Sequence, residues 1–91
     1  MKQAILKAEK GLLEVSIETT SKTLKTIQIT GDFFFHPESA LEALEAELED
    51  TPLDIKLIRE KITNFYKNNN ITTPGVTIDD WETVIKKALK K

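Results

Sequence analysis

The chain has 91 residues and a mass of 10.3 kDa, with 40% hydrophobic and 31% charged residues, which is typical of one soluble globular domain. A domain of this size buries one modest core and has little stability to spare for a deep catalytic cavity, which disfavours an enzyme acting alone. Thirteen Lys and Arg against fifteen Asp and Glu give a net charge of -2, so the surplus of cations expected of a nucleic-acid-binding protein is missing.

The first third of the chain alternates apolar and polar residues with the period of two that a half-buried strand requires. This pattern covers residues 13–17 and again 26–30, and the polar stretch 19–22 between them is short enough for a hairpin loop. We expect a third strand over residues 3–8, which turns into the next strand at residues 10–11. The sequence therefore predicts a small antiparallel sheet.

After residue 36 the apolar residues recur every three or four positions, as they do in amphipathic helices. The first helix is predicted to begin at Pro37, a residue that tolerates the first helical position, and to end before Pro52. A second helix begins after Asp54 as N-cap and ends in the asparagines 68–70. The last helix begins after Thr77, with the elements of a capping box.

The predicted helices each have one apolar face, whose members are Leu41, Leu44 and Leu48 in the first, Ile55, Ile58, Ile62 and Phe65 or Tyr66 in the second, and Trp81, Val84, Ile85, Ala88 and Leu89 in the third. Three strands followed by three helices predict a single α+β domain over residues 1–91. In this fold class, helices cover one face of a small antiparallel sheet in two layers.

Motifs that carry chemistry are mostly missing. His36 is the only histidine and there is no cysteine, so a His–Cys metal cluster cannot form and a Ser-His-Asp triad would need His36. The three glycines are far apart and form neither a phosphate-binding loop nor a dinucleotide fingerprint. We expect no catalytic residue, metal or cofactor bound by this chain alone.

The cysteine content, the apolar runs and the N-terminal residues indicate where in the cell the protein is expected. The lack of cysteine fits a reducing environment, and the longest apolar runs fall far short of the roughly 20 residues that span a bilayer. The first seven residues lack the apolar region of a signal peptide. We expect a soluble, cytoplasmic protein with no membrane and no nucleic-acid partner.

Residues 30–37 contain three of the six aromatic residues and the lone histidine, at the point where the predicted strands give way to helices. Consecutive phenylalanines in an extended chain cannot all point to one side, so at least one is expected near the surface. In one interpretation, two phenylalanines fill the core while Asp32 and His36 cap turns. In the other, an exposed aromatic ring anchors a partner protein.

Three segments resemble the C-terminal accessory domain of lipoate protein ligases, a likeness that covers nearly the whole chain. They are Lys-Gly-Leu-Leu-Glu-Val at residues 10–15, Ile-Gln-Ile-Thr-Gly-Asp-Phe-Phe at residues 27–34, and the acidic Leu-Glu helix through residues 44–48. The Gly-Asp-Phe-Phe step is the most specific element. The chain departs from the family after the acidic helix, where Asp-Thr-Pro at residues 50–52 stands in place of an expected glycine.

The resemblance implies a function. In that family a large domain binds lipoate and ATP, forms lipoyl-adenylate and transfers the lipoyl group to a lysine of an acceptor domain. This chain contains neither the lipoate-binding segment nor the catalytic lysine region, and it resembles the small separate subunit of the archaeal-type bipartite ligases. The implied role is a non-catalytic subunit that forms a heterodimer with the catalytic subunit and is required for activation, with ATP, Mg²⁺ and lipoate used by the complex.

The resemblance also directs attention to one surface. The residues expected at or near the docking surface for the catalytic subunit are Lys10, Gly11, Gly31, Asp32, Phe33, Phe34, Phe35 and His36. Two other functions stay open on the sequence alone: a free-standing module that homodimerises through its sheet edge or aromatic segment, and a small acid/base enzyme that uses Asp32 and His36.

Overall fold

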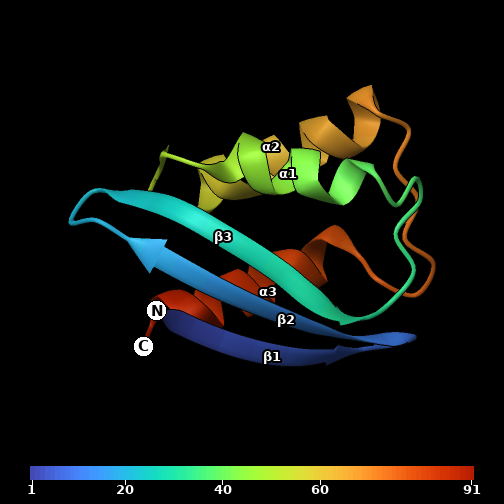
Figure 1. Ribbon diagram of the computed structural model, residues 1–91, viewed down its shortest axis with the longest axis horizontal. Helices are drawn as coiled ribbons and strands as arrows, with labels where there is room; N and C mark the ends of the chain where they lie inside the picture. The colour runs from blue at the N-terminus through green and yellow to red at the C-terminus, as the bar shows by residue number, and fades with distance from the viewer.

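The computed structural model describes residues 1–91 and is an α+β domain with a four-stranded antiparallel sheet and three helices (Figure 1). The strands are β1 (Lys2–Ala8), β2 (Gly11–Thr19), β3 (Thr23–Asp32) and the short β4 (Thr51–Pro52), in the spatial order β1-β2-β3-β4. The helices are α1 (Ala40–Leu48), α2 (Ile55–Asn68) and α3 (Ile78–Leu89). The predicted fold class is confirmed.

The alternation in the sequence sets which face of the sheet is buried. In β2, Leu13, Val15 and Ile17 are fully buried, whereas the residues between them face away from the core. Val15 lies opposite Ala4 of β1 and Ile29 of β3, so each strand contributes its apolar residues to the same face. A one-residue slip would bring the polar residues into the core, which fixes the register.

Helices cover the apolar face of the sheet. Trp81, Ile85 and Ala88 of α3 are buried with Ile58 and Ile62 of α2 in the same cluster as the inward residues of the strands. In Figure 1 α3 passes behind β1 and β2, while α1 lies beside β3. The opposite face of the three long strands carries no helix.

β4 and α1 together cover the edge of the sheet formed by β3. β4 pairs with the start of β3, and farther along the same edge the Glu45 carboxylate of α1 accepts a hydrogen bond of 2.6 Å from the backbone N–H of Ile29. A side chain here satisfies a strand N–H that would otherwise be unpaired. At the other edge no strand pairs with the outer side of β1, and the Lys87 side chain of α3 donates to the outward carbonyl of Ile5 at 3.0 Å.

The predicted helix starts are confirmed in α2 and α3. The Asp54 side chain accepts from the N–H of Lys56, and Thr77 and Asp80 form a reciprocal capping box. Arg59 of α2 pairs with Asp79 and Glu82 of α3, which ties the two helices together on their solvent side.

One boundary and the number of strands differ from the prediction. The first helix begins at Ala40 and not at Pro37, because residues 37–39 form a turn in which the Pro37 carbonyl accepts from the N–H of Ala40 at 3.0 Å. The sheet has a fourth strand, because Asp50 adopts a positive φ of 58° and brings Thr51 against Leu24 of β3. Asp50 thus takes the conformation for which glycine is usually chosen. No helix of the domain combines the length and apolar character needed to cross a membrane.

Candidate partner-docking site

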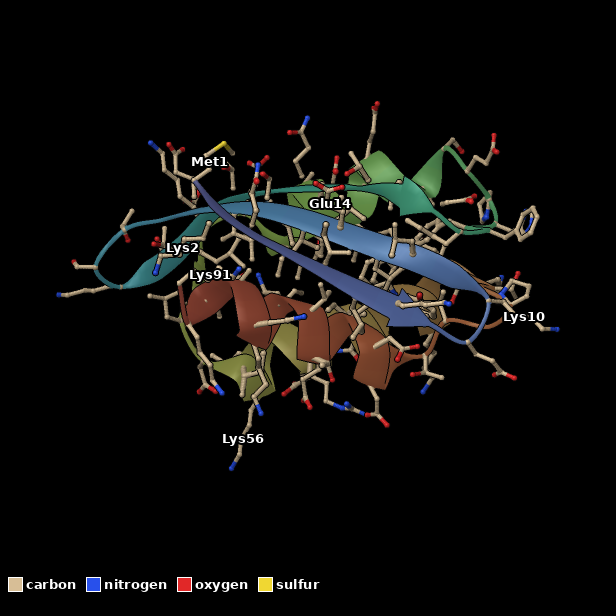
Figure 2. All side chains as sticks on the ribbon, turned by 90° about the horizontal axis from the view of Figure 1, so that it is seen from below. Met1, Lys2, Lys10, Glu14, Lys56 and Lys91 are labelled. Carbon is tan, nitrogen blue, oxygen red and sulfur yellow. The ribbon has the colours of Figure 1, made fainter.

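The predicted docking residues gather at one end of the molecule, which we call the aromatic end: Lys10, Gly11 and Gly31–His36. The β1–β2 turn, the end of β3 and the connection between α2 and α3 meet there (Figure 1), and Lys10 marks this end in Figure 2. The N–H of Lys10 donates to the Gly75 carbonyl at 3.3 Å, which joins the turn to the α2–α3 connection.

Close backbone packing explains two of the glycines. Gly31 has a φ of +133°, and a Cβ at this position would lie 2.1 Å from the backbone oxygen of Leu12. A Cβ on Gly11 would lie 2.7 Å from the Asp32 carbonyl oxygen and 2.8 Å from the Cβ of Phe33. All three distances are shorter than a real Cβ contact allows, so neither position has room for a side chain. The two glycines therefore let β2 and β3 approach closely where the aromatic segment begins.

The three phenylalanines point to different sides, as expected for an extended segment. Phe35 is buried and Phe33 is half-buried, with the Phe33 ring edge-on to Trp81 at 5.5 Å between centroids and to Phe35 at 6.5 Å. Phe35 in turn lies edge-on to Tyr66 at 6.2 Å. Phe33 and Phe35 therefore belong to the core and hold the segment in place.

A hydrogen-bonded group of side chains lies under these rings. The Trp81 Nε1–H donates to the Tyr66 hydroxyl at 2.6 Å, and that hydroxyl is 3.0 Å from Thr73 Oγ1. Thr73 Oγ1 also donates to the Val76 carbonyl at 2.8 Å. Burial raises the pKa of Tyr66 above its ordinary value, although its hydrogen bonds to Thr73 and Trp81 act in the opposite sense. Every buried polar atom of this group is paired, so the base of the aromatic end is rigid.

Phe34 is the ring that faces solvent. It is 64% exposed, the highest exposure of any aromatic side chain among the exposed hydrophobic residues, and it stacks on the His36 imidazole at 6.0 Å with an interplanar angle of 11°. His36 is held by two backbone hydrogen bonds with Thr72, both of 2.9 Å. The exposed pair is thus presented on a fixed backbone, which lowers the entropy lost when a partner binds it.

A hollow of about 240 Å³ lies beside this pair. Its lining residues are Thr30, Gly31, Phe33, Phe34, Phe35, His36, Glu38 and Leu41. An exposed aromatic ring next to a partly apolar hollow is the arrangement found at the anchor points of protein–protein interfaces.

The fold brings the predicted docking residues together at one end of the molecule. The prediction missed three residues that lie beside them: Leu12, Glu38 and Leu41. Leu12 is 40% exposed because it falls on the solvent side of the β2 alternation and lies opposite Asp32. An apolar residue out of phase with its strand is a signal that could have identified it. Asp32 and His36, the candidate acid/base pair, are both exposed and form no side-chain hydrogen bond with each other.

The chain matches the family model described as the bacterial lipoate protein ligase C-terminus over residues 2–85. It belongs to that family. The chain is 39% identical over 75 residues to lipoate-protein ligase A subunit 2 of Thermoplasma acidophilum. The aligned residues make up 82% of this chain and 77% of the relative. The likeness read from the Gly-Asp-Phe-Phe step is confirmed.

The fold agrees with the same relationship. A chain from the structural analysis of an archaeal lipoylation system, described as a bipartite lipoate protein ligase and its E2 lipoyl domain from Thermoplasma acidophilum, superposes with a TM-score of 0.83 at 35% identity. The superposition covers 92% of the present chain and 93% of the Thermoplasma chain. The two chains therefore share the same fold over most of their lengths.

Proposed function

We propose that this chain is the second, accessory subunit of a two-chain lipoate protein ligase and forms a heterodimer with the catalytic subunit. The observation that carries the proposal is the match, over nearly the full length of both chains, to a chain of a bipartite ligase. The chain on its own has no place where three His, Cys, Asp or Glu side chains come together as at a metal site. In the proposed complex, lipoate, ATP and Mg²⁺ are bound by the catalytic subunit.

The aromatic end is the surface that we assign to the heterodimer. Phe34 offers an exposed aromatic ring on a backbone held by Thr72, and the adjacent hollow can accept a side chain of the catalytic subunit. Gly11 and Gly31 act indirectly, since they permit the close packing on which the position of the ring depends.

The step that needs this subunit is the activation of lipoate to lipoyl-adenylate, which precedes transfer of the lipoyl group to a lysine of an acceptor domain. Adenylation requires a site that excludes water around the reacting carboxylate and ATP, and a docked domain can complete such a closure. Transfer from a preformed adenylate has less need of that closure. No residue of this chain is assigned a catalytic role.

The test is to measure lipoyl-adenylate formation by the catalytic subunit from the same cell, with and without this chain, at fixed ATP, Mg²⁺ and lipoate. Adenylate is expected to form only when both chains are present. In a parallel reaction supplied with preformed lipoyl-adenylate, transfer to an acceptor domain is expected to proceed without this chain.

Equal adenylate formation by the catalytic subunit alone would overturn the proposal. A concentration-dependent mass of the isolated chain would then favour the homodimerising interaction module. Loss of both activation and transfer in the absence of this chain would show that it stabilises the catalytic subunit as a whole and has no specific part in activation.

A further inference from the structure

β1 is an open edge of the sheet, in contrast to the closed edge at β3. Ile5, in the middle of β1, is 49% exposed, and its carbonyl oxygen accepts only from the side chain of Lys87 at 3.0 Å. A residue of an antiparallel strand points its N–H and C=O to the same side, so the N–H of Ile5 also faces away from β2. The alternation places the backbone groups of Gln3 and Lys7 on that free side too.

Lysines outnumber acidic residues along this edge. Lys2 reaches the Leu89 carbonyl at 3.4 Å, and Met1, Lys2 and Lys91 lie together at one end of β1 (Figure 2). A hollow of about 320 Å³ along the edge is lined by Gln3, Ala4, Ile5, Glu14, Lys87 and Lys91. A second hollow, of about 270 Å³, is lined by Thr83, Lys86 and Lys87 of α3 and by Lys90, the residue that follows the helix.

None of these lysines takes part in an ion pair, because the three ion pairs of the protein involve Lys25 and Arg59. In a chain with a net charge of -2, the cluster is a local excess of positive charge: Glu14 is the one acidic residue that lines these two hollows, against the four lysines Lys86, Lys87, Lys90 and Lys91. Charge complementarity therefore calls for an acidic partner segment.

The open edge is continuous with the aromatic end across the uncovered face of the sheet. One row across the three strands consists of Lys7, Leu12 and Asp32, each opposite the next. A second row on the same face consists of Ile5, Glu14 and Thr30, and Thr30 lines the hollow beside Phe34. A stable interface involves roughly 20–30 residues from each partner. The hollow at the aromatic end is lined by eight residues, so the hollow alone is smaller than such an interface, and the neighbouring open edge can extend it.

We propose that an extended, acidic segment of the catalytic subunit adds to β1 as a fifth strand, with its carboxylates facing the lysines of α3. The backbone N–H and C=O groups of Gln3, Ile5 and Lys7 pair with the added strand, and the Lys87 amino group moves from the Ile5 carbonyl to a carboxylate of the partner. This inference rests on the proposed function, because it extends the same heterodimer contact beyond the aromatic end.

Amide hydrogen exchange of the wild-type chain, measured alone and in the heterodimer, tests the inference without any substitution. The outward amides of Gln3, Ile5 and Lys7 are expected to become protected in the complex, since each gains a strand partner. Unchanged exchange at these three amides in a fully formed complex would overturn the added strand.

Variants provide a second measurement. Ile5→Pro removes the outward N–H and fixes φ at a position where an edge strand tolerates proline, and it is expected to weaken binding of the catalytic subunit about five- to tenfold. Ile5→Val keeps the N–H and is expected to leave binding unchanged. Lys87→Glu is expected to weaken binding about two- to fivefold, with a reduced dependence on salt. The matched charge reversal Lys56→Glu, on α2 and pointing away from the sheet in Figure 2, is expected to have no effect.

The outcomes separate this inference from the proposed function. If Phe34→Ala weakens the heterodimer while the Ile5 and Lys87 variants do not, the strand addition is wrong and the accessory role stands. If no heterodimer forms with the wild-type chain, the proposed function fails first. Protection of the β1 amides that grows with the concentration of the isolated chain would show a second copy on the edge and overturn the inference.

Discussion

Replacing Phe34 with alanine is expected to weaken the heterodimer and leave the domain folded. Full burial of a phenylalanine side chain stabilises by about 1.5–3 kcal/mol, and 64% of this residue is still exposed in the free chain. Covering that remaining part is therefore worth about 1–2 kcal/mol, which corresponds to a roughly 5- to 30-fold higher Kd for the variant.

The assay is calorimetric or optical titration of the catalytic subunit with wild-type and variant chains, together with thermal unfolding of each chain alone. Leu57→Ala is a matched control, because Leu57 is a large apolar residue of α2 that is 41% exposed but does not line the hollow beside Phe34. We expect wild-type affinity for the control and an unfolding temperature close to wild type for the Phe34 variant, since little of its ring is packed.

Two results would refute this reasoning. An unchanged Kd for a folded Phe34→Ala chain would show that the ring does not enter the interface. A loss of affinity of the same size in Leu57→Ala would show that the site lies elsewhere or that the contact is spread evenly over the surface.

The remaining predictions concern the scaffold of the aromatic end. Gly31→Ala forces a Cβ against the Leu12 carbonyl at a φ of +133° and is expected to cost roughly 1–3 kcal/mol of unfolding free energy, measured by urea denaturation; an unaltered midpoint would contradict the close approach of β2 and β3. Thr77→Ala removes the capping box of α3 and is expected to cost about 0.5–2 kcal/mol, seen as a lower thermal midpoint, whereas Thr83→Ala on the exposed side of the same helix changes little. Tyr66 is the only tyrosine, so the tyrosinate absorbance of the folded chain reports it alone and is expected to titrate above the ordinary value of about 10. Because the folded-state pKa is raised, the stability linked to this group is fully present below about pH 10 and is lost as the pH rises through the folded pKa, so Tyr66→Phe is expected to show a smaller loss over that range; titration at or below the ordinary value would contradict its burial.

The elements with strong local signals follow from the sequence. The alternation around Leu13 and Ile27 sets the buried face of the sheet, and Thr77 with Asp80 sets the start of α3, because each depends on residues close in the chain. The start of α1 does not follow in the same way. Pro37 is compatible with a first helical position, but the turn at residues 37–39 delays the helix to Ala40.

Features that depend on contacts between residues far apart in the chain could not be predicted from local sequence patterns. β4 has two residues and forms only because Thr51 meets Leu24, which lies 27 positions earlier in the numbering of the chain. The alternation indicates that at least one phenylalanine reaches the surface, but the choice of Phe34 is made by Trp81 and Tyr66, which take up Phe33 and Phe35. The residues of the docking site could thus be selected as a segment, while their division into buried and exposed rings required the fold.

The chain has no cysteine, which permits the most direct test of the docking surface. A photoactivatable cross-linker is attached to Phe34→Cys, and separately to Leu57→Cys as control, and each chain is irradiated with the catalytic subunit and lipoate and ATP. A cross-link to the catalytic subunit is expected from position 34 and none from position 57. Cross-linking from position 57 alone would contradict the claim that the aromatic end is where this subunit meets its partner.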